Sequence, residues 1–296
     1  MKVKFWGTGA AEGIPCGFCG CPVCQEARRM GGRYQRTRAQ VMIDDQLLVD
    51  MGPDTYTNAN RAGYDLSQLE NVLITHSHCD HFYPNELHNR QIEFSYDMKY
   101  PTLKLYGSQD VYDQYFNFMG ADNVSNIGNI SKSRGKYLID QKRVALNVLE
   151  EYKTYDIGEF KVTPLPATHG GQPFVYIIEK DGKGIFYLND CGTLKEEVFE
   201  WLAKSNFKLD LVIYDCTHAM RNTLTDQEGK YWSHMGQPNN IVTRQRLTEM
   251  GLCSDKTISV ETHFSHNGIS VGYGDFAPLA EKAGFICAYD GMELDI

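Results

Sequence analysis

The sequence predicts an α/β fold, because short apolar runs of strand length alternate with segments whose apolar residues recur at a helical spacing. Several of these strand-like runs end at a histidine or an aspartate, where functional side chains tend to lie. The chain has 296 residues, which exceeds the usual size of one domain, but no internal linker or repeat divides it. We therefore expect one α/β domain over residues 1–296.

The first half of the chain is expected to be rich in strands. Its predicted strands are apolar runs bounded by turn residues: Lys2–Trp6, Gln40–Ile43, Leu47–Asp50 and 71–75. The second and third of these flank an Asp-Asp-Gln turn, which predicts a hairpin. A helix is predicted from Pro53 to Gly63, since Pro and Asp suit its first turn and Gly its end.

The second half continues the alternation of strands and helices. Two apolar runs within 160–190 flank Lys180–Lys183 and predict a second hairpin. Later strands are expected at 210–214, 256–262 and 285–289, and helices at 194–204, 239–250 and 275–283. Residues 109–140 show weak periodicity with scattered Gly, Asn and Ser, so we interpret them as an insertion near the mouth of a pocket.

Four side chains able to bind metal lie within six residues, at His76, His78, Asp80 and His81. The cluster directly follows the predicted strand 71–75, and such a concentration of polar groups needs partners, which divalent ions provide. Because His76 and His78 are two residues apart, they lie on one side of an extended segment and can bind one ion. Asp80 and His81 follow at a turn and can reach a second ion.

Composition and charge narrow the functional classes. The chain is 42% hydrophobic and 23% charged, and no apolar run reaches the roughly 20 residues of a membrane span. The start shows no apolar signal region, so a cytoplasmic location is expected. The net charge of −9 argues against non-specific nucleic-acid binding but is compatible with an anionic substrate at a local cation site.

The nine cysteines are unevenly distributed, with four at positions 16, 19, 21 and 24. In a chain without an export signal, such crowding favours a metal site over disulfides. A structural zinc ion needs four Cys or His ligands, and a site built from Cys16, Cys19, Cys21 and Cys24 is one possibility.

The His-x-His-x-Asp-His motif resembles that of the metallo-β-lactamase superfamily. This resemblance implies a four-layer αββα sandwich with metal ions at one edge. It also implies further ligands in order along the chain at His169, Asp190 and His263, each at the end of a predicted strand. On this basis His76, His78 and His169 bind one ion, Asp80, His81 and His263 bind another, and Asp190 bridges the two.

Within the superfamily, the chain is most similar to the phosphoribosyl 1,2-cyclic phosphate phosphodiesterase family of the carbon–phosphorus lyase pathway. The shared motifs are Gly7-Thr8-Gly9, Cys19-x-Cys21-x-x-Cys24, His76–His81 and His263-x-x-His266. The resemblance implies a structural zinc ion bound by Cys19, Cys21, Cys24 and His266, which leaves Cys16 spare. This knuckle loop covers about 9–32, and zinc is expected to fix it because the segment lacks obvious core residues.

These assignments imply a dinuclear hydrolase for a small cyclic phosphodiester, with Mn²⁺ or Zn²⁺ in the active site. A hydroxide between the ions is the expected nucleophile. Two divalent ions, Asp80, Asp190 and hydroxide leave a charge of about +1, which suits a phosphodiester of charge −1. His234 matches the family's general acid, and Asp80 is the second expected catalytic residue. The stretch Arg221–Trp232 is longer than the family pattern and is expected to border the pocket.

Two other readings stay open. A non-catalytic or cofactor-handling protein like the pyrroloquinoline quinone biosynthesis B family shares the cysteine knuckle, but members of that family typically lack the intact histidine motif. An RNA-processing nuclease of the same fold shares the ligands, but no long basic arm is visible. A homodimer is compatible with the sequence. Other residues carry weaker expectations: His218 as a pocket candidate, His88 as structural, and Cys79 and Cys191 without a role.

Overall fold

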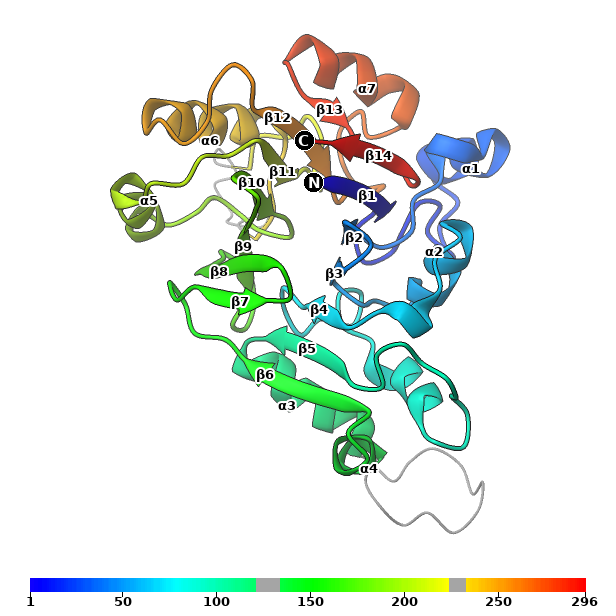
Figure 1. Ribbon diagram of the computed structural model, residues 1–296. Coiled ribbons are helices and arrows are strands. Elements are labelled where there is room, and N and C mark those ends of the chain that lie inside the picture. Colours follow the sequence, from blue (N-terminus) through cyan, green and yellow to red (C-terminus); the bar gives the residue numbers. More distant parts are fainter. Residues whose placement is uncertain (121–133, 224–232) are drawn as a thin grey trace.

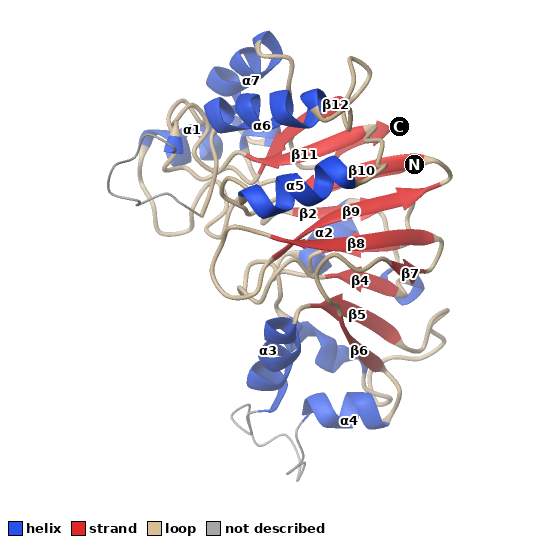
Figure 2. Cartoon of the chain, turned by 90° about the vertical axis from the view of Figure 1, so that its left-hand side faces the viewer, coloured by secondary structure: helices blue, strands red, loops and turns tan. Residues whose placement is uncertain are grey.

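The computed structural model describes residues 1–120, 134–223 and 233–296. Its centre consists of two seven-stranded sheets. Figure 2 shows the sheets stacked with helices on their outer sides. Three hydrophobic clusters match these layers, one between the sheets and one between each sheet and its helices. The predicted α/β sandwich of four layers is therefore confirmed.

The first sheet mixes antiparallel and parallel pairing. Its strands in spatial order are β14 (Met292–Asp295), β1 (Lys2–Gly7), β2 (Gln40–Ile43), β3 (Leu47–Val49), β4 (Asn71–Leu73), β5 (Leu103–Gly107) and β6 (Val144–Val148). β2 and β3 form the expected antiparallel hairpin, and from β3 to β6 the strands run parallel.

In chain order, the second sheet starts with an antiparallel meander and finishes with parallel strands. Its strands in spatial order are β13 (Ile286–Cys287), β12 (Ile258–Thr262), β11 (Leu211–Asp215), β10 (Lys183–Leu188), β9 (Phe174–Lys180), β8 (Phe160–Pro166) and β7 (Tyr155–Ile157). The predicted hairpin joins β9 to β10, whereas β10 to β13 are parallel. All five residues of β11 are buried, as expected for a central strand covered on both faces.

Helices cover the outer face of each sheet (Figure 1). Those packed on the first sheet are α2 (Thr55–Arg61), η2 (Leu66–Gln68), η3 (Pro84–Arg90), α3 (Gln109–Gly120) and α4 (Arg134–Asp140). Those on or beside the second sheet are α1 (Pro22–Met30), η1 (Gly32–Tyr34), α5 (Glu196–Lys204), α6 (Gln237–Glu249) and α7 (Tyr273–Lys282). In α5, for example, Val198, Phe199 and Leu202 form the buried stripe.

The structure corrects one interpretation of the sequence and describes part of the segment to which another refers. The segment 9–32 does contribute core residues, because Ile14, Cys24 and Ala27 are buried and residues 22–30 form α1. The described parts of 109–140 are the helices α3 and α4, which connect the parallel strands β5 and β6. Residues 121–133 lie outside the described part, so the role of this segment as an insertion stays a prediction.

The two ends of the chain lie together in the first sheet (Figure 1). β1 pairs with β14 over Lys2–Phe5, and the Met1 ammonium donates a hydrogen bond to the Ile296 carbonyl. At the other end of β1, the partly buried Asp290 carboxylate accepts hydrogen bonds from Thr8 and Thr37. Among the described residues, none of the helices combines the length and apolarity that crossing a membrane requires.

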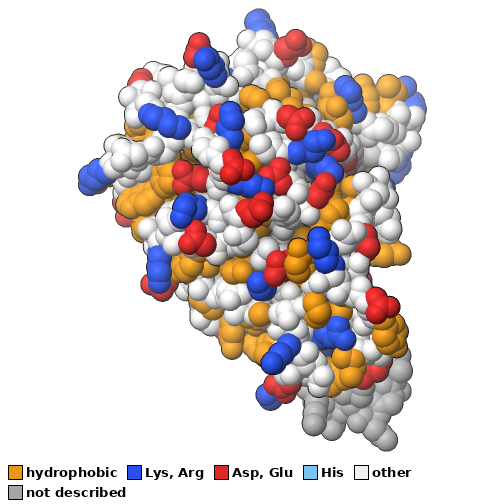
Figure 3. Space-filling view, in the orientation of Figure 1, with side chains coloured by type: hydrophobic (Ala, Val, Ile, Leu, Met, Phe, Trp, Pro, Cys, Tyr) orange, Lys and Arg blue, Asp and Glu red, His pale blue; other side chains and the backbone are white. Residues whose placement is uncertain are grey.

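The face shown in Figure 3 mixes charges of both signs, with Lys and Arg side chains interspersed among Asp and Glu. Such a face offers no continuous basic track for a nucleic-acid backbone. The expectation drawn from the net charge, that the protein does not bind nucleic acid non-specifically, stays a prediction.

The Tyr176 hydroxyl links the two sheets beneath the histidine motif, since it donates a 2.7 Å hydrogen bond to the Ile74 carbonyl. Both residues are fully buried. We expect Tyr176→Phe to lower the free energy of unfolding by about 1–3 kcal/mol, because a buried carbonyl loses its donor. Urea unfolding of the metal-loaded protein measures this. Tyr112→Phe, at a partly exposed side chain on α3, is the control. Equal losses in both variants would contradict the prediction.

Candidate metal centre

The candidate site lies at the edge where the strands of both sheets end. β3 and β4 are parallel and lead to Asp50 and His76, while β10, β11 and β12 are parallel and lead to Asp190, Asp215 and His263. Parallel strands place their carboxyl ends on one side, so residues far apart in the sequence meet there. The structure brings all seven predicted ligands together at this edge.

Three imidazoles form the first group of ligands with Asp190. His78 Nδ1 lies 2.9 Å from His76 Nε2 and 3.1 Å from His169 Nε2, and Asp190 Oδ2 lies 3.2 Å from His76 Nε2. His169 Nδ1 donates to the Ser233 carbonyl, so the lone pair of its Nε2 is directed at the group. A single proton cannot satisfy three converging nitrogens, whereas a cation can.

The second group comprises Asp80, His81, His263 and again Asp190. His81 Nε2 lies 3.1 Å from Asp80 Oδ2, 2.9 Å from Asp190 Oδ2 and 3.3 Å from His263 Nε2. All four residues are buried. Nitrogen and carboxylate oxygen donors in this number suit Zn²⁺ or Mn²⁺. Because Asp190 Oδ2 contacts both groups, this carboxylate is the natural bridge between two ions.

Hydrogen bonds from outside the groups fix the orientation of the ligands. His81 Nδ1 lies 2.7 Å from Asp50 Oδ2, and His263 Nδ1 lies 2.8 Å from Thr217 Oγ1. Each contact engages the ring nitrogen that faces away from the group and leaves the other nitrogen for an ion. Asp50 is itself held, since Thr75 donates to its Oδ1 through both backbone and hydroxyl.

The protonation tendencies of the first group favour metal binding. Burial lowers the pKa of His76, His78 and His169, and the positive charge of neighbouring histidines acts in the same direction. These rings are therefore neutral at pH 7, which is the form that ligates a metal. For His81, burial acts downward, but the Asp80 and Asp50 carboxylates outweigh it and raise the pKa well above its ordinary value. A cation in the second group would take the place of that proton.

His234 lies beside the same centre. Its Nδ1 is 3.0 Å from Asp190 Oδ1 and 3.1 Å from Asp215 Oδ2. Asp215 is fully buried and accepts further hydrogen bonds from the amides of Thr217 and Met235. Burial opposes the charged form of His234, but hydrogen bonds to both carboxylates outweigh it and raise its pKa to about 10.

A cavity of about 520 Å³ opens onto these residues. Its lining includes His78, Asp80, His169, Asp190, His234 and His263, and also His218, so this histidine does border the pocket. The remaining lining residues are Ala10, Ala11, Glu12, Thr217, Ser265 and Asn267. This volume is in the usual range for small-molecule sites.

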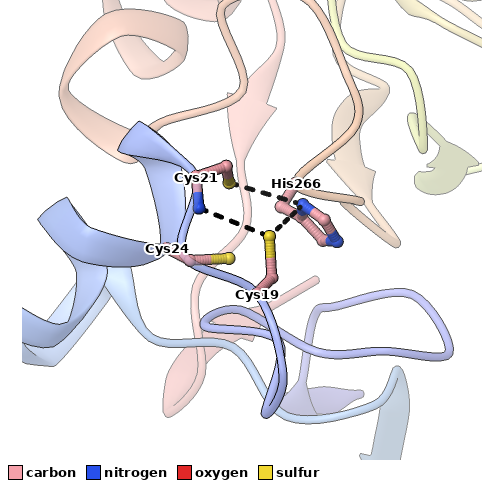
Figure 4. A group of neighbouring side chains, drawn as sticks. All are labelled: Cys19, Cys21, Cys24 and His266. Carbon is pink, nitrogen blue, oxygen red and sulfur yellow. Dashed lines mark hydrogen bonds between the residues drawn. The ribbon is translucent and has the colours of Figure 1, made fainter.

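The cysteine group combines Cys19 and Cys21 of the loop before α1, Cys24 of α1 and His266 of the loop after β12 (Figure 4). His266 Nδ1 is 3.7 Å from Cys19 Sγ and 3.5 Å from Cys21 Sγ, and Cys24 completes the group. A tetrahedral zinc ion with Zn–S of about 2.3 Å and Zn–N of about 2.0 Å separates its sulfur and nitrogen ligands by about 3.5 Å. The donor set and its spacing therefore fit zinc.

Other features of the cysteine loop support the same ligand set. Burial raises the pKa of Cys21, but the hydrogen bond from the Cys24 amide and those of its neighbours outweigh it and lower the pKa to about 7. Arg28 of α1 donates to the carbonyls of Cys16 and Cys19 and holds the loop against the helix. Cys16 is outside the group and contributes its amide, which donates to Cys24 Sγ.

The remaining predicted residues are not members of the ligand groups. His88 Nδ1 contacts the Asn85 carbonyl within η3, Cys79 is exposed, and Cys191 is buried beside Asp215. Of the stretch 221–232, only 221–223 is described, and there Thr223 donates to the His234 carbonyl. The sequence interpretation missed Asp50 and Asp215. Both directly end or follow a predicted strand, as Asp190 does, but only Asp190 was named by the resemblance to the superfamily.

The fold and the site define a metal-binding α/β sandwich, and comparison with known proteins gives its family. A model described as a beta-lactamase superfamily domain matches residues 45–248. The chain therefore belongs to the beta-lactamase superfamily, in agreement with the resemblance noted in its histidine motif.

Individual relatives are more distant. Ribonuclease Z of Listeria monocytogenes is 29% identical over 190 residues, which are 62% of this chain and 51% of that protein. The chain thus aligns with about half the length of the curated relatives it matches. A diphosphatase from the PhnP family has a TM-score of 0.67 at 19% identity, over 100% of this chain and 97% of that chain. Zn²⁺-bound PqqB from Methylobacterium extorquens has a TM-score of 0.72 at 18% identity, over 100% of both chains. These two likenesses show the shared fold.

Asp190 belongs to both histidine groups, and its loss should affect both. We expect Asp190→Ala to lose most of the metal bound by these groups while the cysteine group keeps its ion, because the shared carboxylate is removed only from the former. Metal content by mass spectrometry measures this. Asp255→Ala, at an exposed position, should keep the full content. Full metal content in Asp190→Ala would contradict the bridging assignment.

Cys16 and Cys19 provide a matched pair for the cysteine group. We expect Cys19→Ala to lose one zinc ion per chain and to lower the thermal midpoint, because zinc binding and folding of the loop are coupled. Cys16→Ala should retain the ion. Loss of zinc from Cys16→Ala with retention in a His266→Ala variant would instead favour the four-cysteine site.

Proposed function

We propose that this protein is a dinuclear metal-dependent phosphodiesterase that hydrolyses a small phosphodiester of the phosphoribosyl 1,2-cyclic phosphate type. The observation that carries the proposal is the Asp190 carboxylate, which is shared between two groups of nitrogen and oxygen donors beside His234. Divalent ions held there lower the pKa of bound water toward neutrality and stabilise negative charge on phosphoryl oxygens. The superfamily assignment supports the coarser class of metal-dependent hydrolase.

The charge of the site suits a phosphodiester. Two divalent cations contribute four positive charges, and the carboxylates of Asp80 and Asp190 offset two of them. The diester group of the substrate, which has a charge of −1, is therefore attracted although the whole chain carries a net charge of −9. The cavity of about 520 Å³ matches a small substrate better than an extended polymer.

In this proposal, His234 donates a proton to the departing oxygen. Asp215 and Asp190 hold its Nδ1, which leaves Nε2 of the same ring for the substrate in the cavity that His234 lines. The two carboxylates favour the protonated ring, which is the form that a general acid requires. Asp215 thus acts on the reaction by orienting His234.

We propose zinc as the ion of the cysteine group and Mn²⁺ or Zn²⁺ for the histidine groups. Three thiolates and an imidazole favour zinc, whereas histidine and carboxylate donors accept either ion. In this arrangement His263 serves the active site and His266 the cysteine group, three residues apart on one loop.

An RNA-processing nuclease is the second candidate, because the curated relatives reported above are ribonuclease Z proteins. The acidic net charge and the mixed charges of the face in Figure 3 favour the small-substrate proposal over it. A cofactor-handling role like that of PqqB is disfavoured by the complete set of histidine and aspartate donors. Cleavage of a precursor tRNA by the metal-loaded protein, at a rate exceeding that on small diesters, would reverse this order.

The first test is hydrolysis of bis(p-nitrophenyl) phosphate against p-nitrophenyl phosphate by the metal-loaded protein. We expect the diester to be the better substrate and Asp80→Ala to lose at least about 100-fold in activity, because a ligand of the second group is removed. The cysteine group should keep its zinc in this variant. No turnover of the diester by protein with a full metal content would overturn the proposed function.

A second prediction isolates the proton donated by His234. We expect His234→Ala to lower the hydrolysis of diesters with alkoxide leaving groups by about 10²–10⁴-fold, and to have much less effect with p-nitrophenolate, which departs without a proton. Rates of methyl p-nitrophenyl phosphate and of a dialkyl phosphate measure the difference. His88→Ala, outside the cavity lining, is the control. Equal losses on both substrates would exclude the role of general acid.

A further inference from the structure

Glu12 contributes a carboxylate to the lining of the cavity. It belongs to neither group of metal ligands, and the proposed mechanism does not use it. Glu12 lies on the loop after β1 and lines the same cavity as Asp80, Asp190 and His234. The carboxylates of Asp50 and Asp80 contact His81, and that of Asp215 accepts a hydrogen bond from the Thr217 amide. Glu12 is instead partly exposed, with 25% of its side chain accessible.

The side chain of Glu12 is anchored through one oxygen. The Ser265 hydroxyl donates to Glu12 Oε1, and the same oxygen lies 3.7 Å from His266 Nε2. Ser265 is buried and its Oγ also accepts from the Asn267 amide, which fixes the hydroxyl. Among the described residues, Glu12 Oε2 has no hydrogen-bond partner. A fixed carboxylate therefore offers one acceptor oxygen to whatever fills the cavity.

The surroundings restrict the chemical class of that occupant. Among the described residues, the cavity lining contains no Lys or Arg. A second phosphate placed against Glu12 would meet a like charge without a compensating cation. An ammonium group there would lie near a metal centre whose net charge is positive. A neutral hydroxyl avoids both repulsions and donates to a carboxylate in a charge-assisted hydrogen bond.

Resting on the proposed function, we infer that Glu12 is a specificity-determining residue that accepts a hydrogen bond from a hydroxyl group on the organic part of the substrate. The substrates are then phosphodiesters of a polyol or sugar. Asn267, which lines the same cavity, supplies a further neutral polar group for such a molecule. Ser265 is a positioning residue, because it acts through Glu12.

The test compares two diesters that differ only in hydroxyl groups, glyceryl p-nitrophenyl phosphate and propyl p-nitrophenyl phosphate. The readout is the ratio of their kcat/KM values with metal-loaded protein. We expect the wild type to prefer the glyceryl diester by about tenfold or more and Glu12→Gln to lose most of this preference, because the charge-assisted bond is weakened. Ser265→Ala, which frees the carboxylate without removing it, should lose part of the preference.

Glu26→Gln is the matched control, since it removes the same charge from α1 at a residue that does not line the cavity. It should keep the wild-type ratio, and all variants should keep their zinc. An unchanged ratio in Glu12→Gln, or hydrolysis of both diesters by the wild type without preference, overturns this inference and leaves the phosphodiesterase intact. Hydrolysis of neither diester by wild-type protein with full metal content overturns both. Should Glu12→Gln fail to fold, an unchanged ratio in Ser265→Ala overturns the inference.

Discussion

The placement of the Asp190 carboxylate is the constraint on which the active centre depends. One of its oxygens lies 3.2 Å from His76 and 2.9 Å from His81, and the other lies 3.0 Å from His234. Its backbone adopts the left-handed conformation, with φ of 48°, directly after a buried strand. A non-glycine residue pays strain for this conformation, and the surrounding strands hold it there. The central position of β10 in its sheet thus determines where the two groups of candidate metal ligands and His234 meet.

The polar core around the centre extends this constraint into the fold. Asp50 and Asp215 are fully buried, which is costly for a carboxylate unless it is paired. Both accept backbone amides and both contact a histidine of the site, Asp50 from the first sheet and Asp215 from the second. The two sheets are therefore joined at this edge by groups that also orient the histidines. The loop after β12 adds a second connection, because His263 and His266 serve different groups of ligands.

Much of this architecture can be predicted from the sequence, and the failures have physical causes. The histidine motif can be recognised because four possible metal ligands lie within six residues. The hairpins at β2–β3 and β9–β10 can be predicted from the turn residues between apolar runs. Helix α1 escapes prediction because its buried positions are the small residues Cys24 and Ala27. Asp50 and Asp215 escape because a single carboxylate after a strand is common, and only the tertiary structure shows which histidine it contacts. Glu12 likewise has no local pattern.

The meeting of the two chain ends has a consequence for biogenesis. β1 pairs with β14, and the cysteine loop before α1 receives His266 from near the other end. The ribosome synthesises the amino-terminal part first. Contacts between segments far apart in the sequence form only after the later segment has been synthesised. During synthesis the nascent chain therefore carries three thiols without their histidine partner. If the cysteine group binds zinc as proposed, all four ligands are available to the ion only once His266 has been synthesised.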